Sequence, residues 1–139
     1  MRFEIIFLPG FFMTSPSTVL VVEDNDFVRM QLIRFLEEGG FAVLEAKDGM
    51  VALDLLKTNL DVQVLILDLR MQPIDGLEVI KALQSQGRNI PVVVVTGDQN
   101  PDLLAEAARW HVSAVLMKPV QKDRLVKMVS RAIEHYNRR

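Results

Sequence analysis

Five short apolar runs recur along the chain from residue 18 onward, and stretches with helical spacing separate them. Each run is almost continuously hydrophobic, which is typical of a strand buried on both faces of a parallel sheet. The predicted strands are Thr18–Val22, Ala42–Ala46, Val62–Leu67, Pro91–Val95 and Ala114–Met117.

The stretches between the strands carry apolar residues on one helical face and begin with residues that cap helices. Asn25 or Asp26 caps a first helix, which runs to about Glu38, where Gly39-Gly40 stops it. The later predicted helices are one capped by Asp48 and ending near Thr58, one capped by Asp75 from Gly76 to about Gln86, one from Asn100-Pro101 to Trp110, and a last one lined by Leu125, Val126, Val129, Ala132 and Ile133. This alternation predicts an α/β fold, with five parallel strands, helices on both faces and right-handed crossovers.

Residues 1–17 form an apolar extension that differs from the domain predicted over 18–139. Two interpretations stay open: Met13 is the real start of the protein, or Glu4–Leu8 is an extra strand or apolar arm. A signal peptide is disfavoured because Glu4 interrupts its start and Pro9-Gly10 splits its apolar stretch.

Composition narrows the class of protein. The chain has 139 residues, which favours one domain, and is 50% hydrophobic, enough for a sizeable core. Its net charge of -2 suggests no nucleic-acid surface, and the lack of cysteine excludes disulfides and thiolate chemistry. No apolar run reaches the roughly 18 residues of a membrane-spanning helix. We therefore expect a cytoplasmic protein with neither a nucleic-acid nor a membrane partner.

Four of the predicted strands end in polar residues of distinct kinds: Glu23-Asp24, Asp68, Thr96 and Lys118. The carboxyl ends of parallel strands share one edge, where ligands bind in open α/β sheets. Crowded carboxylates repel unless a cation enters, and Mg²⁺ suits such oxygen ligands. An aspartate can accept a phosphoryl group, and a lysine and a hydroxyl can hold its oxygens.

Each of these residues alone is more typical of a turn, a helix cap or a solvated loop, and only their joint placement favours a site. Trp110 is expected to pack at a helix end, and His111 to lie on the surface. His135 falls in the last turn of the final helix. Two histidines far apart in the sequence support no histidine metal site.

These residues resemble the receiver domain of two-component response regulators over about Thr18 to Tyr136. The motifs that carry the resemblance are Val21-Val22-Glu23-Asp24-Asn25, Leu67-Asp68-Leu69-Arg70-Met71 with Asp75-Gly76, Val95-Thr96-Gly97 and Met117-Lys118-Pro119. The resemblance implies a flavodoxin-like, doubly wound sheet with strand order 2-1-3-4-5. It also implies a cis Lys118–Pro119 peptide bond.

The resemblance further implies the role of each site residue. Asp68 would accept a phosphoryl group from a histidine kinase or a histidine phosphotransfer protein. Asp24, Asp68 and the backbone carbonyl of Arg70 would bind Mg²⁺ directly, and Glu23 would act through water. Thr96 and Lys118 would hold the phosphoryl oxygens.

Three positions depart from the family pattern. The first acidic pair is Glu23-Asp24 where the family often has two aspartates. Gln72 stands where a proline is expected, with Pro73 one place later, so the loop beside the acceptor should differ locally. Val115 stands where the family has its switch aromatic, so the usual coupling from Thr96 to an aromatic ring is expected to differ or weaken.

One further expectation concerns the mouth of the site. Arg70 lies two residues after Asp68, and Asp98 lies two residues after Thr96. Both fall on loops at the same sheet edge, so we predict an ion pair between Arg70 and Asp98 that restricts the attacking water.

The leading hypothesis for function is a stand-alone receiver, a monomer or weak homodimer, that catalyses only its own phosphoryl transfer and dephosphorylation. Its downstream partner would bind the face made by the fourth helix, fifth strand and fifth helix. The alternatives are a scaffold with weakened switching, and a receiver excised from a larger regulator or hybrid kinase. A hydrolase with an aspartyl nucleophile is disfavoured because Arg70 stands where such enzymes carry a second aspartate. A flavin-binding module is weaker still, because acids follow the first strand where a phosphate-cradling loop is needed.

Overall fold

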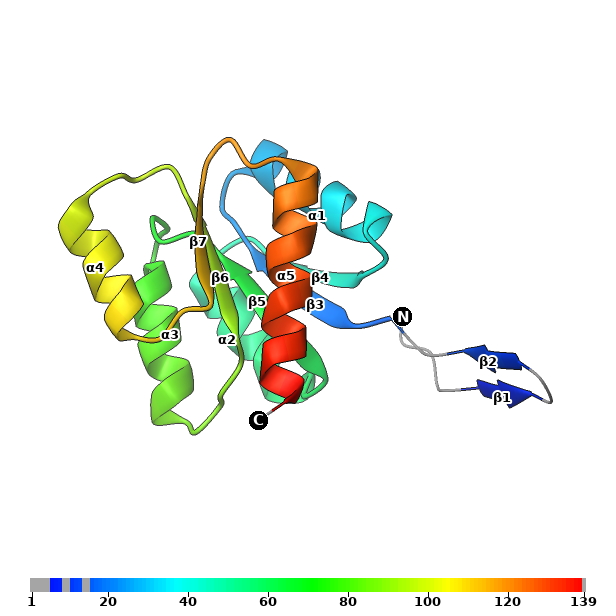
Figure 1. The fold of residues 1–139 in the computed structure, drawn as a ribbon. Helices are drawn as coiled ribbons and strands as arrows, with labels where there is room; N and C mark the ends of the chain where they lie inside the picture. The colour runs from blue at the N-terminus through cyan, green and yellow to red at the C-terminus, as the bar shows by residue number, and fades with distance from the viewer. Residues whose placement is uncertain (1–5, 9–10, 14–15, 139) are drawn as a thin grey trace.

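The computed structural model describes residues 6–8, 11–13 and 16–138, and its centre is a five-stranded parallel sheet. Its strands are β3 (Thr18–Val22), β4 (Ala42–Ala46), β5 (Val62–Leu67), β6 (Val92–Thr96) and β7 (Ala114–Met117). They lie in the order β4-β3-β5-β6-β7, all parallel (Figure 1). This is the order 2-1-3-4-5 within the domain, so the predicted topology is confirmed.

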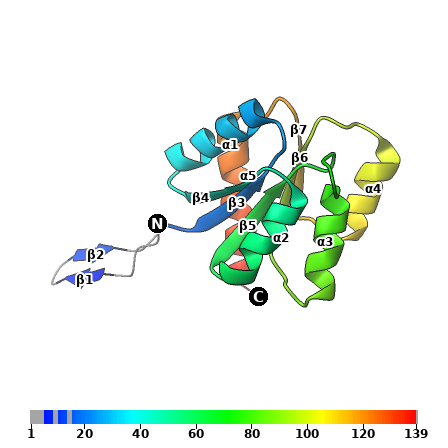
Figure 2. The same cartoon turned by 180° about the vertical axis from the view of Figure 1, so that it is seen from behind.

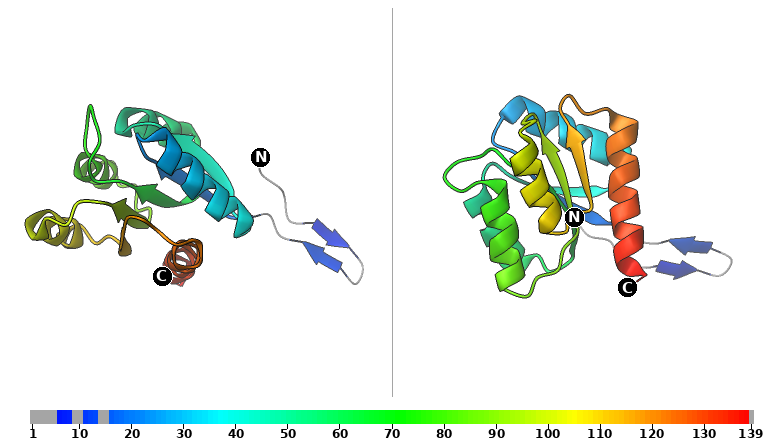
Figure 3. Two further views of the ribbon diagram at one scale, coloured as in Figure 1. Left: turned by 90° about the horizontal axis from the view of Figure 1, so that it is seen from above. Right: turned by 60° about the vertical axis from the view of Figure 1, so that its left-hand side comes forward.

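Five helices cover both faces of this sheet: α1 (Asp26–Glu38), α2 (Gly49–Thr58), α3 (Gly76–Ser85), α4 (Pro101–Arg109) and α5 (Lys122–Asn137). Helices α1 and α5 lie on one face, and α2, α3 and α4 lie on the other (Figures 2 and 3). The fold is thus the doubly wound, three-layer arrangement that the alternation of strands and helices predicts.

Two hydrophobic clusters, one on each face of the sheet, form the core. In β5, Leu65 and Leu67 belong to the cluster under α2 and α3, while Val64 and Ile66 belong to the cluster under α1 and α5. Because side chains alternate between the two faces, a strand covered on both sides needs an apolar residue at every position. This explains why the strands appear in the sequence as continuous apolar runs.

The predicted caps are formed. The side chains of Asn25, Asp48, Asp75 and Asn100 each accept a hydrogen bond from a backbone N–H in the first turn of their helix. Gly39 caps the end of α1 as predicted, and Gly40 has a φ of 93°. A left-handed φ costs glycine little, because glycine has no Cβ.

Several boundaries differ by a residue or more from the prediction. Strand β6 begins at Val92 rather than at the preceding proline, and it includes Thr96. Proline has no N–H to donate to the sheet, so it fits poorly as an inner ladder residue. Helices α3 and α4 end at Ser85 and Arg109, each one residue earlier than expected.

The N-terminal segment contains a separate two-stranded sheet, in which β1 (Ile6–Leu8) pairs antiparallel with β2 (Phe11–Met13). One interpretation of the sequence is an extra strand or apolar arm at Glu4–Leu8. The structure has a strand at Ile6–Leu8, and residues 4 and 5 lie outside the described residues. Within the part of the chain that is described, none of the helices is both long and apolar enough to span a bilayer.

Candidate functional site

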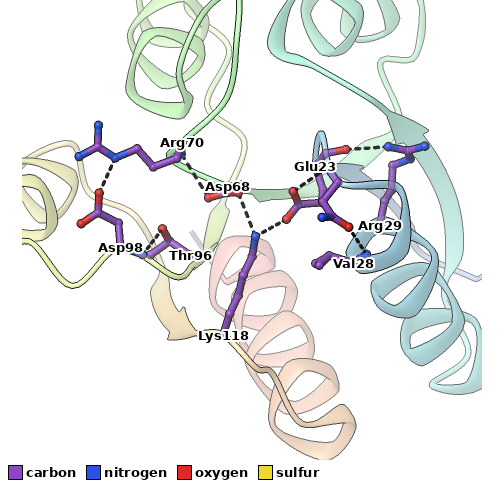
Figure 4. A network of polar contacts seen from close by, with 9 residues as sticks. Glu23, Val28, Arg29, Asp68, Arg70, Thr96, Asp98 and Lys118 are labelled. Atoms are coloured by element: carbon purple, nitrogen blue, oxygen red, sulfur yellow. Dashed lines mark hydrogen bonds and ion pairs between the residues drawn. The ribbon is translucent and has the colours of Figure 1, made fainter.

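The predicted site residues converge at the carboxyl edge of the sheet (Figure 4). Backbone hydrogen bonds continue the ladder just past the strands: the Glu23 N–H donates to Ala46, the Asp68 N–H to Val22, and the Lys118 N–H to Thr96. These bonds hold each polar residue one step beyond its strand. Glu23, Asp68 and Thr96 are almost fully buried, at 1%, 6% and 0% exposure.

Lys118 links the two buried carboxylates. Its Nζ lies 2.9 Å from Asp68 Oδ2, to which it donates a hydrogen bond, and forms an ion pair with Glu23 Oε1 at 2.5 Å. Burial disfavours the charged lysine, but the contacts with both acids outweigh it and raise the pKa of Lys118. Burial raises the pKa of Glu23 above its ordinary value, against the lowering effect of Lys118.

Three carboxylates meet the requirements of a divalent cation. Glu23, Asp24 and Asp68 each offer an oxygen, and these oxygens lie within 4.8 Å of one another. Glu23 Oε2 accepts a hydrogen bond from the Asn25 N–H, and the buried Glu23 Oε1 lies against the Lys118 ammonium. A nearly fully buried carboxylate beside two other carboxylates fits a hard metal ion with oxygen ligands. The residues present therefore fit Mg²⁺.

A cleft of about 630 Å³ opens on the other side of Asp68, lined by Asp68, Arg70, Thr96, Gly97, Asp98, Gln99 and Lys118. Asp68 Oδ1 accepts a hydrogen bond of 3.2 Å from the Arg70 N–H. Thr96 Oγ1 accepts one of 3.1 Å from the Asp98 N–H. The carboxylate of Asp68 thus lies between the acidic cluster and a polar cleft that has room for a small anion.

The predicted ion pair at the mouth is formed. Arg70 Nε donates to Asp98 Oδ2, with the arginine side chain 66% exposed and the aspartate 18% exposed. Two contacts lower the pKa of Asp98. The hydrogen bond from the Asn100 N–H has the larger effect, and the hydrogen bond from Arg70 has the smaller one. The pair joins the loop after β5 to the loop after β6.

Two peptide bonds before prolines and three side chains near the site can be compared with the predictions from the sequence. The Lys118–Pro119 peptide is cis, as predicted, and Gln72–Pro73 is also cis, in the loop where a local difference was expected. Val115 is partly buried and packs against the cluster under α2, α3 and α4. Trp110 caps the end of α4 with Lys81 over its ring, and His111 is exposed, as expected for both.

Arg29 is the residue beside the site that the sequence analysis missed. Its guanidinium contacts the Glu23 carbonyl and the carboxylates of Asp26 and Glu45. No motif marks it, since an arginine on a helix is ordinarily a solvated residue. Its position five residues after Asp24, on the turn of α1 that faces back to β3, was the available signal.

The comparisons with known proteins agree with this geometry. The sequence model of the response regulator receiver domain matches residues 19–130. The chain is 31% identical over 121 residues to the transcriptional regulatory protein FixJ of Bradyrhizobium diazoefficiens, covering 87% of this chain and 58% of that protein. It is 29% identical to the CAI-1 autoinducer sensor kinase/phosphatase CqsS of Vibrio cholerae, covering 81% of this chain and 17% of that one.

Among solved structures, a response regulator receiver protein from Pseudomonas putida aligns with a TM-score of 0.81 and 30% identity, over 86% of this chain and 99% of that one. A parallel sheet in this order, with acids, a hydroxyl and a lysine at its carboxyl edge, defines a receiver fold. The chain belongs to the receiver domain family of two-component response regulators.

Proposed function

We propose that this receiver accepts a phosphoryl group on Asp68 from the phosphohistidine of a histidine kinase or phosphotransfer protein, and that the modification controls binding to another protein. The observation that supports this most directly is the placement of the Asp68 carboxylate. It is bound by Lys118 on one oxygen and by the Arg70 N–H on the other, and it lines a polar cleft.

In the transfer, an Asp68 carboxylate oxygen forms a bond to phosphorus as the bond between phosphorus and the donor imidazole nitrogen breaks. The imidazole keeps the electron pair of the broken bond and takes a proton from solvent. Lys118 and the Thr96 hydroxyl, at the side of the cleft, stabilise the charge on the phosphoryl oxygens. Water later attacks the phosphorus and releases inorganic phosphate, which returns Asp68 to its carboxylate.

Glu23, Asp24, Asp68 and the Arg70 carbonyl would hold Mg²⁺, with Glu23 acting through water. The ion supplies positive charge that neutralises the phosphoryl oxygens during transfer. The protein places the three carboxylates together and buries two of them, Glu23 and Asp68. Because crowded carboxylates repel one another, this arrangement favours a bound cation.

The output surface we propose is the face formed by α4, β7 and α5. Strand β7 is an edge strand of the sheet, and its Met117 is 37% exposed beside Lys118. Val115 gives this face no aromatic switch, so we expect the signal to pass through Thr96 and the backbone of β7. The chain spans 58% of FixJ, so both a stand-alone receiver and a receiver within a longer regulator fit its length.

The test is phosphorylation by phosphoramidate with Mg²⁺, applied to the wild type and to Asp68→Asn and read by intact mass. The proposal expects one labile phosphoryl group on the wild type, none on the variant, and no labelling when EDTA replaces Mg²⁺. A folded wild type that gains no phosphoryl group would contradict it and favour a scaffold that binds its partner without phosphate.

A further inference from the structure

The acidic loop after β3 is held in place by a side chain outside the metal site. Arg29, at the end of the first turn of α1, donates from Nη1 to the Glu23 carbonyl at 2.9 Å, from Nε to Glu45 Oε1 at 3.0 Å, and from Nη2 to Asp26 Oδ1 at 2.6 Å. One guanidinium therefore joins the end of β3, the first turn of α1 and strand β4. Figure 4 shows its contact with the Glu23 carbonyl.

The three contacts differ in burial, and the contact with the loop is the protected one. The Arg29 side chain is only 12% exposed, whereas Asp26 and Glu45 are 84% and 59% exposed. Ion pairs with such exposed partners are worth little, about 0–1 kcal/mol. A hydrogen bond from a charged donor to a partly buried carbonyl is stronger, at about 1.5–3 kcal/mol. The ion pair with Glu45, which links α1 to β4, therefore contributes little to stability.

The Glu23 carbonyl, which accepts the hydrogen bond from Arg29, lies directly before Asp24 in the loop. It belongs to the peptide unit that joins Glu23 to Asp24, and that unit is planar. A donor fixed on its oxygen fixes the plane, and with it the direction in which Asp24 leaves the strand. The Glu23 side chain is fixed separately, by the Asn25 N–H on one oxygen and by Lys118 on the other. Asp24 is exposed.

We propose that Arg29 is a positioning residue for the metal site: its hydrogen bond to the Glu23 carbonyl orients the Glu23–Asp24 peptide so that the Asp24 carboxylate faces Asp68. The inference rests on the proposed function, because it takes the acidic cluster as the site for Mg²⁺. A lysine cannot replace this arginine, since an ammonium group lacks the planar fork that reaches three acceptors in fixed directions.

The experiment is a calorimetric titration of the full chain with Mg²⁺, for the wild type, Arg29→Gln, Arg29→Lys and Glu45→Gln. Groups that orient metal ligands typically contribute about 10–100-fold to metal affinity. We expect Arg29→Gln and Arg29→Lys to bind Mg²⁺ at least about tenfold more weakly. Glu45→Gln is the matched control: it removes the ion pair with β4, keeps the bond to Glu23, and should leave the affinity within about twofold.

A second readout separates positioning from a general loss of structure. In phosphorylation by phosphoramidate, both Arg29 variants should need a higher Mg²⁺ concentration for half-maximal rate, and at saturating Mg²⁺ they should approach the wild-type rate. If a folded Arg29→Lys binds Mg²⁺ like the wild type, the proposal is wrong. It is also wrong if Arg29→Gln and Glu45→Gln weaken binding equally.

Asp24→Asn distinguishes failure of this inference from failure of the proposed function. If Asp24→Asn weakens Mg²⁺ binding and the Arg29 variants do not, the metal site stands and the role of Arg29 is refuted. If the wild type and Asp24→Asn bind Mg²⁺ equally, the acidic cluster is not the metal site, and both proposals fall.

Discussion

At the scale of single residues, the ion pair between Arg70 and Asp98 lies at the mouth of the cleft beside Asp68. An exposed pair is worth only about 0–1 kcal/mol, so it contributes little to stability. Its effect should instead be on access, because the two side chains join the two loops that border the cleft beside Asp68. The formation of the pair follows from the spacing of its residues in the sequence, and its kinetic effect is a prediction.

We predict that Asp98→Ala shortens the lifetime of the aspartyl phosphate, by up to about fivefold, which is what 1 kcal/mol corresponds to in rate. Asp98→Asn separates charge from loop structure, because its amide oxygen can still accept from the Asn100 N–H as the native Oδ1 does. Both variants should hydrolyse faster than the wild type when phosphate release is followed after removal of the donor. An unchanged lifetime in Asp98→Ala would show that the pair does not restrict water.

The raised pKa of Glu23 predicts that its contribution to the free energy of unfolding decreases as the pH rises. Burial raises the pKa of Glu23 above its ordinary value of 4.5, so the folded protein keeps this proton to a higher pH than the unfolded chain does. The stability that Glu23 contributes is full below pH 4.5 and is lost as the pH rises through the raised pKa.

Glu23→Gln lacks this titration. We therefore expect the free energy of unfolding of the variant, minus that of the wild type, to increase as the pH rises from 4.5 toward neutrality. Urea denaturation in EDTA, at a series of pH values, measures the difference without bound cations. A difference that stays constant or decreases over this window would refute the assignment of a raised pKa to Glu23.

At the scale of elements, the loop between β5 and α3 folds closely over its own strand end. A Cβ on Gly76 would lie 2.4 Å from the Asp68 carbonyl oxygen and 2.9 Å from Leu69 Cα, and both of these are backbone atoms. The Gly76 N–H also donates to the Leu69 carbonyl at 3.0 Å. The start of α3 is thus pressed against the residue that we propose as phosphoacceptor.

Gly76→Ala should destabilise the protein by about 1–3 kcal/mol, the usual cost of overpacking, because backbone rather than a flexible side chain must move. Gly97→Ala is the control: its nearest neighbour would be Lys118 Cδ at 4.0 Å, so stability should change by no more than about 0.5 kcal/mol. Chemical denaturation measures both. Equal stability of the two variants would contradict the close approach at Gly76.

Helix α1 carries two large apolar side chains that are highly exposed. Phe27 is 87% exposed and Met30 is 68% exposed, and residues three apart share a helix face. This pair begins three residues after Asp24, next to the acidic loop. Exposed apolar side chains grouped on one face favour a protein contact, and here the contact would be with the phosphodonor.

Phe27→Ala together with Met30→Ala should slow phosphotransfer from a histidine kinase that phosphorylates the wild type, by tenfold or more if about 1.4 kcal/mol of binding is lost. Phosphorylation by phosphoramidate should be unchanged, because a small donor needs no docking surface. Equal slowing with both donors would mean that the substitutions act on the site itself.

At the scale of the whole molecule, most of the fold could be predicted from the sequence because the patterns are local and repeated. A strand covered on both faces must be apolar at each position, and Asn25, Asp48 and Asp75 mark helix starts by their own hydrogen bonds. The convergence of Glu23, Asp68 and Lys118 then follows from topology, since parallel strands end at one edge.

Other features depend on contacts that no sequence pattern encodes. The three-way contact of Arg29 joins residues 23, 26 and 45, and it exists only because β3 and β4 are neighbours in the sheet. The ion pair between Lys118 and Glu23 depends likewise on side-chain direction across strands β3 and β7, which are not adjacent. Such details arise from packing rather than from periodicity.

We propose Asp68 as the phosphoacceptor, and the most direct test is to locate the phosphorylated residue in the chain. After phosphorylation by phosphoramidate with Mg²⁺, borohydride reduction converts an aspartyl phosphate to homoserine, and peptide mass spectrometry locates the reduced residue. We predict homoserine at position 68 alone. Homoserine at position 24, or a phosphorylated chain without homoserine at position 68, would contradict this account.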